Sequence, residues 1–316
     1  MLSPALVTDP NRIPGTVLAA LPWRSRLWLA WMKWAPRLGS RVPGGSALFR
    51  LLHGRRRVSE PGDSLVALEA AALPRLLVVD PTDYEVYQHT IPLWLHGSPE
   101  HDLIRRHLRP GALFVDVGAN YGVYSLFAAS LRLDGAQVLA IEPQPTQAEA
   151  IRRSAMRNRL TNIEVVEALA GESEGEATLF VPESGSGSAS QSERYAARGS
   201  RVTMLRRPRL RIDDLLANRR TQRLDLLKVD VEGYETDVIL GARQAITRFR
   251  PLISFEVNLL ALSCRGDAPE GAASVLREMG YRRFVELASG RPLDMSRVAG
   301  SALLNVVALP GTEELA

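Results

Sequence analysis

The stretch of this 316-residue chain that decides the fold is Leu113–Ser125, LFVDVGANYGVYS. An apolar run leads to Asp116, a turn with Gly118 and Gly122 follows, and an apolar helical segment then begins. Glycines let the backbone turn tightly and come close to a ligand, which lies beyond the carboxyl end of the strand. A carboxylate at that strand end repels a pyrophosphate but can accept hydrogen bonds from an ammonium group. We therefore expect a ligand that carries an ammonium there.

A second acid follows at the end of the next apolar run, in Gln137–Pro143, QVLAIEP. A carboxylate at the position of Glu142 can accept both hydroxyls of a ribose. A nucleoside that lacks phosphate but carries an amino acid would satisfy Asp116 and Glu142 together, and S-adenosylmethionine is such a molecule. The alternative, a generic tight turn followed by a surface acid, explains each motif alone better than it explains the pair.

The third motif is Leu224–Glu235, LDLLKVDVEGYE, in which an expected strand ends near Asp230 and Glu232. Residues two apart on a strand share a face, so Lys228 would lie on the side of these two acids. A lysine in an apolar strand needs an acidic partner, because an unpaired buried charge is costly. Carboxylates here could hold an ammonium, a metal ion or a reacting hydroxyl. In the alternative interpretation, Lys228 is in a structural ion pair and Glu235 lies on a solvated helix face.

From residue 111 onward, short apolar runs alternate with helical segments, which is typical of a parallel sheet with crossover helices and predicts an α/β fold. The expected strands are Ala112–Val117, Gln137–Ile141, Ile163–Glu167, Leu224–Val229, Leu252–Glu256, Arg282–Glu286 and Leu303–Leu309. The expected helices are Val123–Leu131, Thr146–Arg157, Ile212–Asn218, Tyr234–Gly241 and Glu270–Met279.

One segment interrupts this alternation. Residues 183–201 form a Gly/Ser-rich stretch between two extended segments, Ala177–Val181 and Arg201–Leu205, which predicts a hairpin insertion. We expect three regions: a basic, Trp-rich N-terminal extension (residues 1–60), a connector or cap (61–110) and a ligand-binding domain (111–316). The connector holds one expected strand and one expected helix, Arg75–Val79 and Glu100–Leu108.

The composition excludes several classes of protein. Hydrophobic residues make up 46% and charged residues 23% of the chain, which is the balance of a globular protein and not of a disordered one. Cys264 is the only cysteine, so disulfides within the chain and cysteine-based zinc or iron–sulfur sites are excluded. The histidines show no metal-ligand spacing, so the sequence predicts no metal centre of that kind. They are His53, His89, His96, His101 and His107.

The net charge of +4 conceals a basic N-terminal region. Residues 10–59 contain ten Lys and Arg residues and no Asp or Glu. On a helical wheel, three tryptophans share one arc and two basic residues lie opposite, as in helices that lie in a membrane interface. These residues are Trp28, Trp31, Trp34, Arg26 and Lys33. A peripheral membrane contact through residues 10–59 is one interpretation, and packing of the tryptophans on the domain is the other. Nucleic-acid binding is not expected, because no known reading module is visible.

The chain has no uncharged apolar stretch of about 18 residues, so no membrane-spanning helix is expected. Its N-terminus lacks the basic-then-apolar order of a secretory signal. Together with the single cysteine, this predicts a cytoplasmic protein, with the option of a peripheral position on the inner face of the membrane.

The sequence resembles the FkbM family of S-adenosylmethionine-dependent methyltransferases, in elements that follow the family's order from about residue 110 to 285. These are FVDVGANYGVYS (114–125), IEPQP (141–145), RIDDLL (211–216), LLKVDVEGYETDVILGA (226–242) and PLISFEVN (251–258). The resemblance implies a Rossmann-like methyltransferase sheet of seven strands with a final antiparallel strand. It also implies O-methylation of a hydroxyl on a sugar, a glycolipid or another natural product.

The resemblance also implies roles for individual residues. Around the methionine part of the cofactor it places the loop residues Asp116, Gly118, Ala119, Asn120, Tyr121 and Gly122. It places Glu142 at the ribose, Pro143 and Gln144 against the adenine, and Glu167 or Ala168 at the adenine edge. Asp230 and Glu232 would face the methyl group and the acceptor.

Transfer to an alcohol also needs a group that removes its proton. The candidates are Asp230, Glu232 and Glu256, all at expected strand ends on the ligand side. No histidine follows His107, although His89, His96 and His101 could reach the site from the connector. Two other classes remain open. A nicotinamide-dependent oxidoreductase fits the alternation but lacks a full G-x-G-x-x-G loop, and a catalytically silent glycan- or membrane-binding module would not need the acids.

Overall fold

The computed structural model describes residues 15–34, 65–183, 185–198, 201–299 and 303–311. Its centre is a seven-stranded sheet with the order β11-β12-β10-β9-β3-β4-β5. Strand β12 runs antiparallel to both of its neighbours, and the other pairs are parallel. The strands are β3 (Leu113–Val117), β4 (Gln137–Ile141), β5 (Ile163–Val166), β9 (Leu226–Val229), β10 (Leu252–Asn258), β11 (Arg283–Glu286) and β12 (Leu303–Leu309). The predicted α/β fold with a final antiparallel strand is therefore confirmed.

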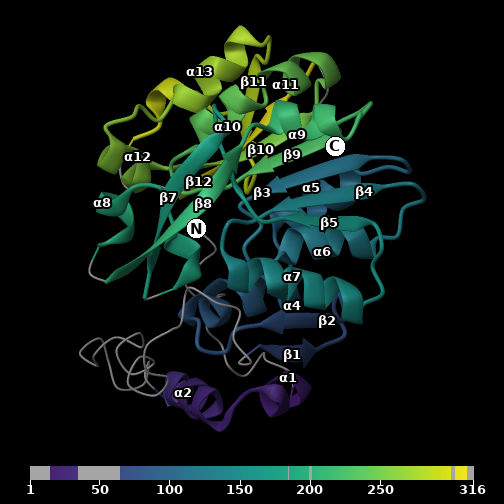
Figure 1. Ribbon diagram of the computed structural model, residues 1–316, viewed down its shortest axis with the longest axis vertical. Coiled ribbons are helices and arrows are strands. Elements are labelled where there is room, and N and C mark those ends of the chain that lie inside the picture. Colours follow the sequence, from purple (N-terminus) through teal and green to yellow (C-terminus); the bar gives the residue numbers. More distant parts are fainter. Residues whose placement is uncertain (1–14, 35–64, 184, 199–200, 300–302, 312–316) are drawn as a thin grey trace.

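Helices cover both faces of this sheet (Figure 1). One hydrophobic core joins the sheet to α5, α6 and α7, and a second joins it to α9, α10, α11, α12 and α13. Burial on both faces explains why strands such as β9 and β10 are buried at every residue. The helices are α5 (Pro99–His107), α6 (Val123–Ser130), α7 (Pro145–Arg157), α9 (Ile212–Asn218), α10 (Glu235–Gly241), α11 (Arg243–Phe249), α12 (Leu259–Arg265) and α13 (Gly271–Glu278).

The order of the strands positions the site. Strand β3 has β4 on one side and β9 on the other. The chain therefore adds β4 and β5 on one side of β3 and the later strands on its other side, so the strand order reverses at β3. In open α/β sheets, ligands bind in the crevice beyond the carboxyl ends of the strands at such a point. The sequence motifs that end with Asp116, Glu142 and Asp230 all run toward this edge.

The predicted hairpin insertion is confirmed and is longer than expected. Strands β7 (Gly175–Pro182) and β8 (Val202–Leu210) pair antiparallel, and β6 (Leu169–Ala170) adds to β8 to form a second, three-stranded sheet. Between β7 and β8 lie a short 3₁₀ turn, η4 (Ser186–Ser188), and helix α8 (Glu193–Ala196). We call residues 183–201 the insertion loop.

The described part of the chain before residue 110 packs on the α6/α7 side. A hairpin of β1 (Val66–Glu69) and β2 (Leu76–Val79), the π-helical turn η3 (Val86–Thr90) and α4 (Ile91–His96) share the core with α7. The expected strand and helix of the connector are thus confirmed as β2 and α5, whereas β1 and α4 were not predicted. The division of the chain into three regions stays a prediction.

The N-terminal helices α1 (Gly15–Ala20) and α2 (Trp23–Trp34) lie on the far side of this hairpin (Figure 1). Val17, Leu21 and Leu29 are buried in the same core, while Trp23 is 60% and Leu27 51% exposed. Other parts of the predicted membrane contact lie outside the described residues: the side chains of Trp28, Trp31 and Trp34, and residues 10–14 and 35–59. Within the described part of the chain, no helix has the length and apolar character needed to span a membrane.

Candidate functional site

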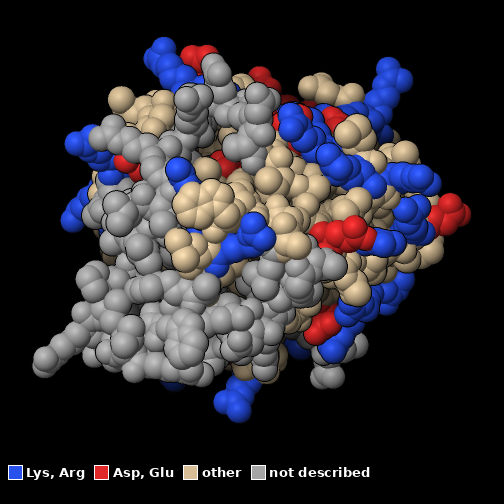
Figure 2. Space-filling view, turned by 90° about the horizontal axis from the view of Figure 1, so that it is seen from below, with Lys and Arg blue, Asp and Glu red and all other residues tan. Residues whose placement is uncertain are grey.

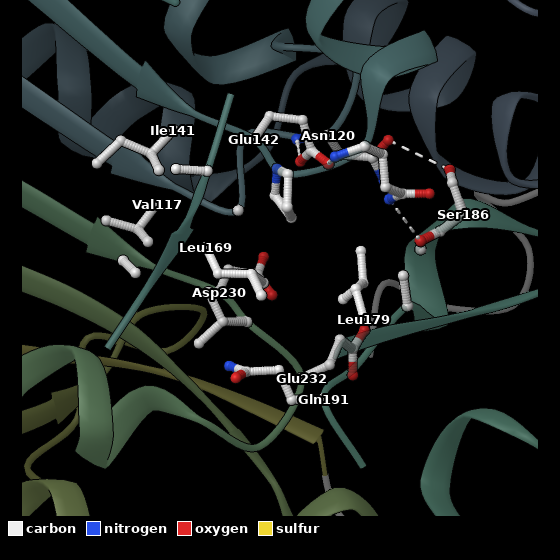
Figure 3. Close-up of a pocket in the computed structure, with 18 residues that line it drawn as sticks. Val117, Asn120, Ile141, Glu142, Leu169, Leu179, Ser186, Gln191, Asp230 and Glu232 are labelled. Atoms are coloured by element: carbon white, nitrogen blue, oxygen red, sulfur yellow. Dashed lines mark hydrogen bonds between the residues drawn. The ribbon is translucent and has the colours of Figure 1, made fainter. Parts of the chain in front are cut away.

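A pocket opens at the carboxyl ends of β3, β4 and β9, and the insertion loop and β7 form its opposite wall (Figure 3). It contains about 620 Å³ of empty space, including open solvent at its mouth. Its sides are lined by Val117 and Ile141 from the strands and by Leu179, Ser186 and Gln191 from the hairpin. Figure 3 shows Glu142 on one side of the space and Asp230 and Glu232 across from it.

The glycine at the start of the loop brings two strands' ends together. Gly118 has a φ of +80°, and a Cβ on it would lie 1.8 Å from the backbone oxygen of Asp230. No side chain fits in that gap, and L-residues rarely adopt such a φ. Gly118 therefore lets the end of β3 approach the end of β9, and both residues line the pocket.

Glu142 is 2% exposed and lies on the pocket wall. One carboxylate oxygen accepts the backbone N–H of Asn120 at 2.8 Å and the other accepts that of Gln144 at 2.9 Å. Burial raises the pKa of this carboxyl to about 7, although the two N–H groups act in the opposite direction. Each oxygen keeps a second lone pair, so the group can still accept two hydroxyls of a ligand.

Asp116 does not line the pocket but is fully buried beneath it. Its Oδ2 accepts a hydrogen bond from Ser125 Oγ at 2.6 Å, and its Oδ1 lies 3.9 Å from Lys228 Nζ. Asp116 and Lys228 are register partners on β3 and β9, so they point to the same face of the sheet. Burial raises the pKa of Asp116, and Lys228 lowers it by a smaller amount. The cation beside Asp116 in this structure is thus a lysine of the chain.

The other residues predicted to bind the cofactor divide into two groups. Those that line the pocket are Gly118, Asn120, Pro143, Gln144, Ala168 and Asp230. Those that do not are Ala119, Tyr121, Gly122 and Glu167. Tyr121 donates its hydroxyl to Asp83 at 2.8 Å, and Glu167 forms ion pairs with Arg152 and Arg207. These contacts hold the loop and the hairpin in place.

Three carboxyl groups meet on the opposite side of the pocket. One oxygen each from Asp230, Glu232 and Glu256 lies within 4.8 Å of the other two. The register explains the meeting, because Ser254 on β10 lies beside Lys228 on β9, so Glu256 and Asp230 follow two residues later on the same face. Lys228 Nζ donates to Asp230 at 2.9 Å, which confirms the expected acidic partner. Burial, followed by the charge of Asp230, raises the pKa values of Glu232 and Glu256.

The insertion loop and β10 fix the orientation of Glu232. The Tyr195 hydroxyl donates to Glu232 Oε2 at 2.7 Å, and Asn258 Nδ2 donates to the same oxygen at 2.7 Å. Ser190 Oγ donates to the backbone oxygen of Glu232 at 2.9 Å. Sequence reasoning missed all three positioning residues. Asn258 ends the family motif PLISFEVN (251–258), but nothing in the sequence assigned it a role. Ser190 and Tyr195 lie in the insertion loop, where the sequence contains no recognisable motif.

Glu235 does not lie on a solvated helix face, so that interpretation was wrong. It is 2% exposed, and its Oε1 accepts the backbone N–H groups of Val231 and Gly233, each at 3.1 Å. Burial raises its pKa to about 7. Glu235 therefore holds the turn between β9 and α10 and is not part of the pocket wall.

The histidines of the connector take different positions. His101 is buried against the rings of Tyr124 and Phe127, and burial lowers its pKa to about 4, so it is a structural group. His89, from η3, pairs through Nδ1 with Glu85. Burial lowers the pKa of His89, but the hydrogen bond and the charge of Glu85, followed by the charge of Asp230, raise this pKa overall. Of these two, only His89 is thus electrostatically linked to the acids of the pocket.

Two solved structures are among those to which this chain is similar. The methyltransferase FkbM of Methylobacillus flagellatus KT is 18% identical, with a TM-score of 0.38 over 71% of this chain and 54% of that one. A putative rRNA-methylase of Clostridium thermocellum is 12% identical, with a TM-score of 0.41 over 66% of this chain and 92% of that one.

A curated relative is more similar in sequence. The 31-O-demethyl-FK506 methyltransferase FkbM of Streptomyces tacrolimicus is 31% identical over 162 residues, which are 44% of this chain and 62% of the relative. The chain thus matches less than two thirds of that protein's length. The family model described as the methyltransferase FkbM domain matches residues 116–283, more than half of the chain. This match confirms the family predicted from the motifs, and the chain belongs to the FkbM methyltransferase domain family.

Proposed function

We propose that the protein is an S-adenosylmethionine-dependent O-methyltransferase. The observation that carries the proposal is the pocket itself, in which the Glu142 carboxylate faces Asp230 and Glu232 across one space at the strand ends. The first group suits the ribose of a nucleoside and the other two suit a reacting hydroxyl. Family membership favours this function over the nicotinamide-dependent oxidoreductase considered from the sequence.

The residues present fit the cofactor. Both oxygens of Glu142 have a lone pair available for the ribose hydroxyls. Gln144 Oε1 is buried without a hydrogen-bond partner among the described residues and lies on the pocket wall, where an amino group such as that of adenine would satisfy it.

The chain's own part in the reaction is to orient an acceptor and take up its proton. When bound, the cofactor supplies a methyl group on a sulfonium, which is a good leaving group. Asp230 and Glu232 offer carboxylate oxygens to an acceptor hydroxyl from the side opposite Glu142. A positioned base contributes about 10²–10⁴-fold to such a step, and alignment of the reacting atoms contributes further.

The acceptor would enter along the insertion loop. Apolar Leu179 and Ala189 alternate there with polar Ser186 and Gln191 on the pocket wall, a mixture that suits a hydroxyl-bearing sugar, glycolipid or natural product. The relative's name specifies a demethylated oxygen of its substrate, which supports oxygen as the methyl acceptor here. A cytoplasmic position, with N-terminal contact to the inner face of the membrane, completes the proposal.

Calorimetry tests the cofactor. Titration with S-adenosylhomocysteine should show one site, and titration with NAD should show none. Binding of NAD alone would contradict the proposal and favour an oxidoreductase.

Methyl transfer is then measured with S-adenosylmethionine that carries an isotopically labelled methyl group, against panels of sugars, glycolipids and macrocyclic alcohols. Cofactor binding without any transfer to hydroxyls would favour the catalytically silent binding module instead.

Two isosteric variants test the acceptor side. Asp230→Asn and Glu232→Gln keep size but remove the charge that holds or deprotonates a hydroxyl, so turnover should fall more than cofactor affinity. Glu149→Gln serves as the control, because Glu149 pairs with Arg153 on the surface of α7. If both pocket variants keep wild-type turnover, the acceptor is activated elsewhere.

A further inference from the structure

The acidic side of the pocket gathers more carboxyl groups than the ion pairs of the described residues offset. Asp230, Glu232 and Glu256 bring their oxygens within 4.8 Å of one another. Close packing of carboxylates away from bulk water is costly unless a cation or a proton lies between them. The cluster is open on one side, because the Asp230 side chain is 33% exposed and lines the pocket with Glu232.

Glu256 is the residue that points to a ligand. It is 8% exposed, its Oε2 is buried, and it forms no hydrogen bond or ion pair with any described residue. Buried polar atoms are nearly always satisfied. A buried carboxyl oxygen without a partner, in a side chain that lies beside two other carboxylates, therefore indicates a missing partner. That partner must be positively charged or a donor.

Lys228 does not fill this role. Its ammonium lies 2.9 Å from Asp230 and 3.9 Å from Asp116, so it is shared between two aspartates. Within the described part of the chain, no ion pair joins Lys228 to Glu232 or Glu256. One ammonium therefore serves two aspartates, and neither glutamate has an ion-pair partner among the described residues.

We propose that Asp230, Glu232 and Glu256 bind one divalent cation of the hard, oxygen-preferring class, Mg²⁺ or Mn²⁺. Three carboxylates from two adjacent strand ends are the ligand type that these ions prefer, and an octahedral ion keeps further positions for water or for a hydroxyl. Tyr195 and Asn258 fix one oxygen of Glu232, and its other oxygen forms no hydrogen bond with a described residue. Orientation of ligating carboxylates by such neighbours is usual in metal sites.

This inference deepens the proposed function, because an ion at this position would orient the acceptor hydroxyl and favour loss of its proton to a neighbouring base. That consequence rests on the proposed function. Binding of the ion does not, because it depends only on the carboxylates and can be measured without cofactor or acceptor.

The test is binding of Mn²⁺ to the full chain at pH 7.5 without cofactor, followed by the electron paramagnetic resonance signal of free Mn²⁺. One site per chain is expected, with competition by Mg²⁺. Glu256→Gln should weaken Mn²⁺ binding at least tenfold, and it should fold because Glu256 has no hydrogen bond to lose. Glu232→Gln is the second variant, and Glu149→Gln is the matched control that should bind like the wild type.

Two results would overturn the inference. One is no saturable binding of Mn²⁺ by the wild type at millimolar concentration. The other is binding that Glu256→Gln and Glu232→Gln leave unchanged, which would place the ion elsewhere. Binding of S-adenosylhomocysteine, measured on the same samples, separates the two proposals: a protein that binds this ligand but no Mn²⁺ keeps the proposed function and loses the metal site.

Discussion

The hydroxyl of Tyr195 donates a hydrogen bond to Glu232 at 2.7 Å, and this contact joins the insertion loop to the end of a central strand. Asn258 donates to both groups, at 2.8 Å to the Tyr195 oxygen and at 2.7 Å to Glu232. The three side chains come from α8, from the turn after β9 and from the end of β10. The insertion is thus part of the site and holds one of its carboxylates in place.

Replacing Tyr195 with Phe should lower turnover about tenfold, a loss of about 1.4 kcal/mol in transition-state stabilisation. The ring still packs, but Glu232 keeps only Asn258 as a donor and can turn away. Cofactor affinity should change little. We therefore expect kcat to fall while the dissociation constant of S-adenosylhomocysteine stays the same. Tyr281→Phe is the control, because it removes a buried tyrosine hydrogen bond to Pro251 away from the pocket. Equal turnover in both variants would show that Tyr195 does not position Glu232.

Glu142→Ala should weaken binding of S-adenosylhomocysteine by about 1.5–3 kcal/mol, the usual range for a hydrogen bond to a charged group. The substitution removes the oxygens available to the ribose, and it also leaves the N–H groups of Asn120 and Gln144 without their acceptor. Calorimetry gives the affinity, and circular dichroism checks that the variant is folded. A folded variant with wild-type affinity would refute the ribose assignment.

Affinity for the cofactor should rise with pH between 6 and 8. In the free protein, burial raises the pKa of Glu142 to about 7, so at pH 6 most molecules carry the neutral acid. Ribose hydroxyls favour the ionised form, so binding releases a proton, and affinity should be up to about tenfold weaker at pH 6 than at pH 8. The stability of the fold depends on pH in the opposite direction. Because the pKa of Glu142 is higher in the folded than in the unfolded chain, this group contributes to the free energy of unfolding at low pH, and the contribution is lost as the pH rises through about 7.

Titrations in two buffers with different heats of ionisation count the released proton directly. Glu142→Gln should flatten the dependence of affinity on pH, because its side chain does not titrate. A variant that keeps the wild-type pH profile would assign the released proton to another group.

Gly118→Ala should destabilise the fold strongly, because its new Cβ would meet the backbone oxygen of Asp230 at 1.8 Å. The matched control is Gly266→Ala, which has nearly the same φ, +82° against +80°, but nothing within 4 Å. Conformational strain alone costs about 1–2 kcal/mol in either variant. Urea denaturation should therefore show a clearly larger loss for Gly118→Ala. If both variants lose the same free energy of unfolding, backbone strain alone, and not the close approach of β3 to β9, accounts for the need for glycine at position 118.

Contact with anionic lipid through the N-terminal region stays a prediction, and the structure suggests where to test it. Figure 2 shows the end of the molecule where α2 lies, with basic side chains around a surface of other residues. Trp23 and Leu27 are exposed there beside Arg24 and Arg26. Flotation with phosphatidylglycerol vesicles should recover the protein at low salt and less of it at about 0.5 M, because salt screens the basic residues.

A double variant, Trp23→Ser with Leu27→Ser, tests the apolar part of this contact. It should reduce the binding that remains at high salt, while it leaves Val17, Leu21 and Leu29 in the core. Substitution is preferable to deletion of the segment, because loss of α1 would uncover β1. Recovery that is independent of both salt and the double variant would contradict a membrane contact through α2.

The sequence by itself determined the fold and one half of the site. Alternating apolar runs and helical segments are local patterns, so β3, β4, β10 and β12 could be placed to within a few residues. Glu142 could be placed at the ligand edge of the sheet for the same reason, because that edge lies at the carboxyl ends of the parallel strands. A lysine in an apolar strand needs an acidic partner, so an acid near Lys228 could be predicted from charge alone, and Asp230 is that partner.

Only the tertiary structure decided which side chains meet. Asp116 and Glu142 look alike in sequence, yet one is buried beside Lys228 and the other faces the pocket. The contact of Tyr195 with Glu232 depends on how the hairpin folds back over the strand ends, and no spacing in the sequence encodes that return. The meeting of Glu256 with Asp230 depends on the register of β9 against β10. Strand periodicity sets the face on which a residue lies, whereas its partners are set by packing between segments distant in the chain.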